Sequence, residues 1–99
     1  MRAALSETST VAAAPEQIWC DLGGEAALLH LPRGIYYGLD SVGARVWALI
    51  QTPTSIRDVR DTIVREYDVD TDRCEQDLMV LLAELAAAGL IVVTDQPGR

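Results

Sequence analysis

The chain has 99 residues, of which 49% are hydrophobic, and its formal net charge at pH 7 is −7. This length suits one domain with one compact core and leaves little room for a large catalytic cavity, so a catalyst is not expected. Eight basic residues spread among fifteen acidic ones argue against nucleic-acid binding, and no apolar run approaches the roughly 20 residues that span a bilayer.

The N-terminal residues 1–15 are rich in Ser, Thr and Ala, and we expect a loosely ordered arm with a short extended piece near Thr10–Ala13. They contain no continuous apolar stretch of the kind found in secretory signals, so a cytoplasmic protein is expected. The folded domain should then span residues 16–94, followed by a frayed tail over residues 95–99.

Three strands are expected next. Apolar residues alternate along Gln17–Leu22, which is the period of a strand, and Gly23-Gly24 then favours a two-residue hairpin turn. Glu25–Leu31 is apolar on both faces, so we expect it to be the central strand. After the turn Pro32-Arg33-Gly34, the third strand, Ile35–Leu39, becomes an edge of the antiparallel sheet.

Helical spacing of apolar residues begins directly after the third strand. Asp40 or Ser41 can cap a first helix that runs to about Ile50. A second helix is expected from Ile56 to Tyr67, with Ser55 placed to cap it.

The third helix is expected over about Thr71–Ala88. Gly89 is placed to terminate it, and Leu90–Thr94 forms a short extended end packed on the helices. The expected fold class is therefore α+β, a winged helix-turn-helix with an N-terminal three-stranded antiparallel sheet followed by three helices.

Two features have both a binding and a purely structural interpretation. The edge strand with Tyr36 and Tyr37 between glycines could pair with an incoming peptide, or its tyrosines could be ordinary strand residues. The third helix is apolar over more than one stripe, from Leu78 to Ala88, so it is either buried on most sides or lines an open hydrophobic groove.

Catalytic and metal-binding patterns are not found. Asp68, Asp70 and Asp72 alternate as in a calcium loop, but Arg73 and Met79 stand where a Gly and a Glu are required. We expect no metal, no cofactor and no catalytic residues.

The remaining residues with reactive side chains receive structural interpretations. His30 is interpreted as a structural residue of the central strand, and Cys20 and Cys74 as free thiols.

The run from Gly34 to Trp47, which reads GIYYGLDSVGARVW, resembles the strand-to-helix signature of PqqD-like proteins. Asp77-Leu78, the run Leu81–Leu85 and the ending Gly89-Leu90-Ile91 are similar to the third helix of that family. The resemblance covers about Ile18 to Val93.

This resemblance implies a recognition element for ribosomally synthesised and post-translationally modified peptides (RiPPs). In that family the leader segment of a precursor adds as an antiparallel strand to strand three, beside helix three. Carried over to this chain, the implied peptide-binding residues are Arg33, Gly34, Ile35, Tyr36, Tyr37 and Gly38 from the strand and its turn, and Cys74, Asp77, Leu78, Leu81, Leu82 and Leu85 from the helix. Because adjacent strand residues point to opposite faces, we expect Tyr37 to share the core face with Leu39 and Tyr36 to be more exposed.

Within the family, this chain looks most like the free-standing leader-binding proteins of lasso-peptide biosynthesis, which have about this length. That resemblance implies a precursor leader peptide, a leader peptidase of the transglutaminase-like cysteine protease type, and a macrolactam-forming cyclase as partners, with no nucleic acid and no membrane. The pyrroloquinoline quinone pathway and other RiPP classes remain open as pathways. A winged-helix DNA-binding regulator and a structural subunit of a modifying-enzyme complex remain the alternative functions.

Overall fold

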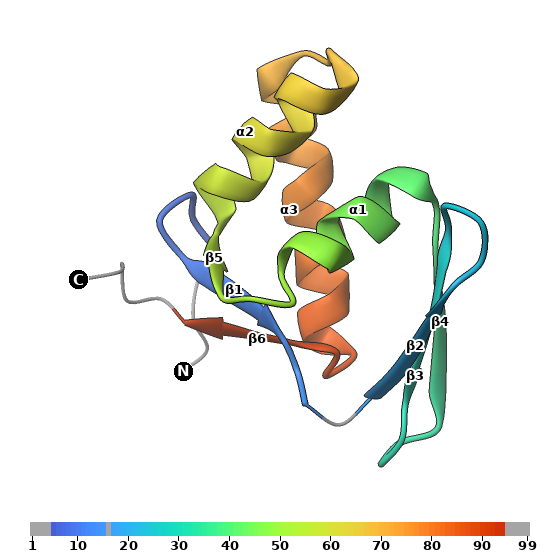
Figure 1. Ribbon diagram of the computed structural model, residues 1–99. Helices are drawn as coiled ribbons and strands as arrows, with labels where there is room; N and C mark the ends of the chain where they lie inside the picture. The colour runs from blue at the N-terminus through green and yellow to red at the C-terminus, as the bar shows by residue number, and fades with distance from the viewer. Residues whose placement is uncertain (1–4, 16, 95–99) are drawn as a thin grey trace.

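Three consecutive strands form an antiparallel meander in the computed structural model, which describes residues 5–15 and 17–94 (Figure 1). They are β2 (Gln17–Asp21), β3 (Ala26–His30) and β4 (Ile35–Leu39), and β3 lies in the centre. Gly23 and Gly24 both have positive φ, 73° and 98°, as the tight turn between β2 and β3 requires. The predicted meander and the edge position of β4 are therefore confirmed.

The register between β3 and β4 determines which tyrosine faces the core. Tyr37 lies opposite Leu28, which is fully buried, and Tyr36 lies opposite Leu29. Tyr37 packs against the core, whereas 68% of Tyr36 is exposed. The predicted orientation of the two tyrosines is confirmed.

Three helices follow the meander, and each begins at a side-chain cap. They are α1 (Ser41–Leu49), α2 (Ile56–Tyr67) and α3 (Thr71–Ala87). Their caps are Asp40, Ser55 and Asp70, whose side-chain oxygens accept a hydrogen bond from the backbone N–H three residues later, at 2.8, 3.1 and 2.9 Å. These bonds satisfy donors that the first turn of a helix leaves free, which explains the starting points.

α3 terminates just before Gly89, as the sequence predicts. The glycine has a φ of 78°, and the N–H of Leu90 donates to the carbonyl of Leu85 at 2.9 Å. A second bond joins the N–H of Gly89 to the carbonyl of Ala86 at 3.1 Å. This pair of bonds is the Schellman arrangement, and it turns the chain from α3 into the final strand.

A second sheet, which the sequence interpretation lacks, holds the N-terminal segment. Its strands are β1 (Thr10–Ala13), β5 (Thr54–Ser55) and β6 (Ile91–Thr94), in the order β5-β1-β6. β1 is central, and Val11 is fully buried. The extended piece expected near Thr10–Ala13 is thus confirmed as a strand, but it is not loose, because it pairs with two segments that lie far away in the sequence.

An ion-pair network adds to this attachment. Glu7 contacts Arg60 of α2 at 2.9 Å, and Arg60 also contacts Glu75 of α3 at 2.9 Å. Glu7 thus joins the N-terminal segment to two helices. The frayed tail expected over residues 95–99 lies outside the described residues.

The core lies where the three helices and the two sheets meet. In Figure 1, α3 runs behind α1, with the β2-β3-β4 sheet on one side and the β5-β1-β6 sheet on the other. Its largest fully buried side chains are Trp47, Leu28, Ile50, Ile56, Leu82, Leu85 and Leu90. Within the described part of the chain, no helix has both the length and the apolar character needed to cross a bilayer.

Candidate functional site

A cavity of about 540 Å³ opens between β4 and α3. Residues of α1 and α2 also contribute to its lining. The lining residues are Tyr37, Gly38, Leu39 and Asp40 from β4 and the cap, Val42, Gly43 and Val46 from α1, Ile63 and Tyr67 from α2, Val69 from the following turn, and Arg73, Cys74, Asp77, Leu78 and Leu81 from α3. We call this cavity the β4–α3 groove.

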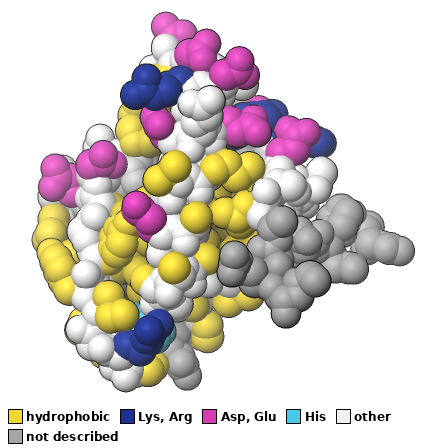
Figure 2. All heavy atoms as spheres, turned by 180° about the vertical axis from the view of Figure 1, so that it is seen from behind, with side chains coloured by type: hydrophobic (Ala, Val, Ile, Leu, Met, Phe, Trp, Pro, Cys, Tyr) yellow, Lys and Arg dark blue, Asp and Glu magenta, His cyan; other side chains and the backbone are white. Residues whose placement is uncertain are grey.

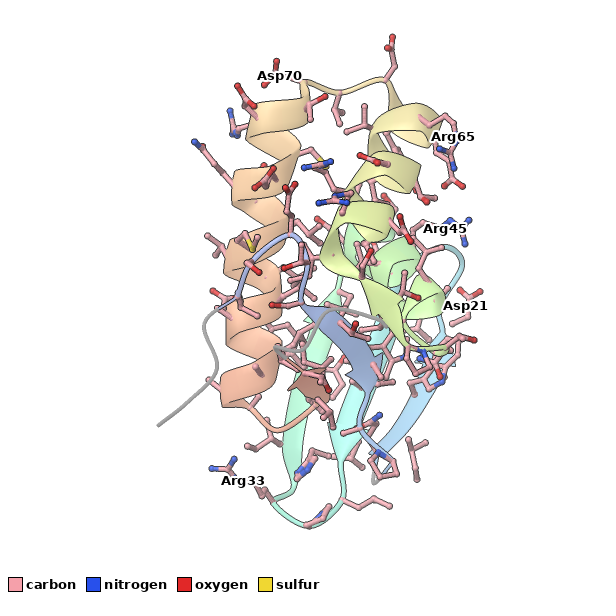
Figure 3. The ribbon with its side chains drawn as sticks, turned by 90° about the vertical axis from the view of Figure 1, so that its left-hand side faces the viewer. Asp21, Arg33, Arg45, Arg65 and Asp70 are labelled. Atoms are coloured by element: carbon pink, nitrogen blue, oxygen red, sulfur yellow. The ribbon has the colours of Figure 1, made fainter. Side chains whose placement is uncertain are left out.

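The groove exists because β4 and α3 run beside each other in opposite directions. At one end lies Gly89, just past α3. A Cβ atom on this glycine would lie 3.4 Å from Nε2 of His30, the last residue of β3, and 3.8 Å from the guanidinium of Arg33 in the β3–β4 turn. At the other end, Asp40 and Cys74 line the same cavity. Figure 3 shows Arg33 and Asp70, which precedes α3, at opposite ends of the molecule.

The free side of β4 borders the groove. β4 pairs only with β3 among the described strands, so alternate backbone N–H and C=O groups face away from the sheet. An extended chain can add at this edge with its inward side chains in the apolar cavity.

The structure divides the predicted site residues into two groups. Those that line the groove are Tyr37, Gly38, Cys74, Asp77, Leu78 and Leu81. Leu82 and Leu85 are not among the lining residues, and both are fully buried in the core. Their contact with a peptide stays a prediction, which these core positions do not favour.

Residues at the start of β4 lie outside the cavity. Arg33, Gly34 and Ile35 belong to the turn and the first strand position, beyond the lining residues. Tyr36 projects from the outer face of the sheet, in register with Leu29 and Ile18, both of which are also exposed. The backbone of these β4 residues still belongs to the free edge of the sheet.

Several lining residues were missed by the sequence interpretation. Val42, in the first turn of α1, is partly exposed at the groove. Tyr67, Val69 and Arg73 come from the α2–α3 junction. Their distance from β4 in the sequence leaves no local signal that could place them beside it.

A hydrogen bond joins the two walls of the groove. The hydroxyl of Tyr37 on β4 donates to Oε1 of Glu84 on α3 at 2.6 Å. This bond and, to a smaller extent, burial of the ring raise the pKa of Tyr37 to about 12. Burial likewise raises the pKa of the Cys74 thiol, which is therefore neutral at neutral pH.

The raised pKa of Tyr37 predicts a loss of stability at high pH. The folded state binds the phenolic proton more tightly than the unfolded state, so the stabilisation is complete below pH about 10 and is lost as the pH rises toward 12. A tyrosinate absorbance titration should show a late ionisation near pH 12 that Tyr37→Phe removes. Equal titration curves for the two proteins would contradict the bond.

Charge around the groove is mainly acidic. Asp40, Asp77 and Glu84 stand along it, and the basic residue among its lining, Arg73, lies 3.3 Å from Asp77. Figure 2, seen from behind, shows hydrophobic side chains gathered over the middle of this face, with acidic side chains around and between them. Within the described ranges, no cluster of three His, Cys, Asp or Glu side chains could hold a metal ion.

Comparisons with known proteins agree with this geometry. The family model described as coenzyme PQQ synthesis protein D (PqqD) matches residues 25–91. A solved structure described as TbiB1 in complex with the TbiA(beta) leader peptide is 35% identical in sequence and superposes with a TM-score of 0.76. That match covers 81% of this chain and 93% of TbiB1. No curated protein sequence matched the chain.

Proposed function

The chain belongs to the PqqD family, and on that basis we propose that it is an adaptor that binds the leader segment of a ribosomally synthesised precursor peptide. PqqD-like recognition elements are generally non-catalytic binding modules. The observation that carries the proposal is the β4–α3 groove, in which a free strand edge stands beside an apolar cavity.

The proposed mechanism is strand addition in a winged helix-turn-helix framework. The leader pairs with the backbone of β4 as an antiparallel fourth strand, which supplies affinity that depends little on sequence. Alternate leader side chains enter the cavity against Leu78 and Leu81, which supplies selectivity.

The consequence of binding is a local concentration effect. A tethered precursor meets a modifying enzyme at a raised effective concentration, although the adaptor itself breaks no bond. We propose a cytoplasmic lasso-peptide pathway, with a leader peptidase and a macrolactam-forming cyclase as the enzymes served. A precursor gene beside genes for both enzymes would support this assignment.

Hydrogen exchange tests the binding edge directly. On adding the TbiA(beta) leader peptide, or the leader of the neighbouring precursor, we expect slower exchange of amides in β4 and in the groove-facing part of α3. β2 is a matched control, because it is the other edge of the same sheet and does not line the groove. Protection of β2 instead of β4 would refute strand addition at β4.

A DNA-binding regulator would need a different charge distribution on α3 from the one that this chain has. A recognition helix needs several basic residues to contact phosphates, but α3 carries only Arg73. A gel shift at low salt with the promoter of the chain's own operon should therefore show no complex. The third possibility, a purely structural subunit, predicts that the protein shows no affinity when it is titrated with the leader peptide.

A further inference from the structure

Glu84 lies at the Gly89 end of the β4–α3 groove, just past Leu81, the last residue of α3 that lines it, although it was not among the residues expected there. It follows Leu81 by three positions on α3, so it shares the groove-facing flank of the helix. Its Oε1 accepts the hydroxyl of Tyr37, which itself lines the cavity. The carboxylate is therefore held on the α3 side of the β4–α3 groove, next to Tyr37 on the β4 side.

The charge of Glu84 has no basic partner in the described part of the chain. Two other acids of α3 are paired, Asp77 with Arg73 and Glu75 with Arg60. Tyr37 donates a hydrogen bond and remains neutral, so the contact orients the carboxylate without cancelling its charge. An oriented, exposed negative charge at the end of an apolar cavity is suited to a cation.

We propose that Glu84, positioned by Tyr37, selects a Lys or Arg side chain of the bound peptide. This basic residue lies two positions from the peptide's apolar anchor, which is the side chain that enters the cavity against Leu78 and Leu81. It lies on the side of the anchor that is nearer to the β3–β4 turn. This inference rests on the proposed leader binding and adds a charge requirement to it. Asp77 and Asp40 on the same groove strengthen the preference for a basic residue over an acidic one.

The spacing of the two elements supports this position. An anchor between Leu78 and Leu81 lies four to five helical residues from Glu84, which is about 6–7 Å along α3 at the usual rise. In an extended peptide, two residues cover about 7 Å and return the side chain to the same face. The next inward side chain after the anchor therefore arrives beside Glu84.

A charge scan of the peptide tests the proposal. Each position of a labelled TbiA(beta) leader peptide is replaced in turn by Lys and by Glu, and binding is measured by fluorescence anisotropy. For the unaltered protein we expect one position at which Lys binds about fivefold more tightly than Glu, as is typical of a partly exposed charge pair. Glu84→Lys should reverse the preference at that position alone, and Tyr37→Phe should reduce it.

Asp72→Lys is the matched control. It makes the same change in net charge on the same helix, but Asp72 lies with Val80 on a flank outside the groove. It should leave the preference at every position unchanged.

The outcomes separate this inference from the proposed function. If the leader binds but no position responds to Glu84→Lys, or if Asp72→Lys has the same effect, the role of Glu84 is overturned and leader binding stands. If no leader peptide binds the unaltered protein, both are overturned.

Discussion

Replacing Leu81 with aspartate is expected to weaken leader binding by about 2 kcal/mol or more, about thirtyfold in Kd, while the protein stays folded. Leu81 is partly buried and lines the β4–α3 groove. In the free protein a carboxylate there keeps contact with water, so the cost to folding is small. An added strand would remove that water and leave the charge beside Asp77 and Glu84, which face the same groove.

The neighbouring residues on α3 provide the controls. Val80 is 60% exposed and does not line the groove, so Val80→Asp should leave both folding and affinity unchanged. Leu82 is fully buried, so Leu82→Asp should unfold the protein because it places a charge in the core. Fluorescence anisotropy with the leader peptide measures affinity, and circular dichroism reports folding. Equal affinities for folded Leu81→Asp and Val80→Asp would refute the placement of the peptide.

The second large effect concerns the N-terminal segment. Val11→Asp is expected to lower the free energy of unfolding by about 4 kcal/mol or more, a large part of the stability of an ordinary domain. Val11 is fully buried in β1, the central strand of its sheet, and an aspartate there would have neither water nor a basic partner. Chemical denaturation followed by circular dichroism measures the change.

Val92→Asp is the matched control for this substitution. Val92 lies opposite Ala12 on the adjacent strand β6, but 50% of it is exposed. Its replacement should cost less than about 1 kcal/mol, within the range for strand positions open to solvent. If both variants have nearly the same free energy of unfolding as the unaltered protein, the N-terminal segment is the loose arm that its composition suggests.

The local structure of this chain could be predicted because its signals act over a few residues. The Gly23-Gly24 turn, the cap at Asp40 and the glycine stop at Gly89 each satisfy backbone groups within about five positions. The alternation along β4 likewise placed Tyr37 inward and Tyr36 outward. The α+β class, the meander and the free edge of β4 followed from these signals.

The sequence by itself therefore determined the secondary structure, the edge strand and the family resemblance. Only the tertiary structure decided that Thr10–Ala13 is a central strand, because its partners lie more than forty and about eighty positions away. It also decided that Leu81 faces the groove and Leu82 the core. The third helix is apolar on several sides, so periodicity alone does not identify the side that the sheets and the other helices cover. The bond between Tyr37 and Glu84, 47 positions apart, depends on the same packing.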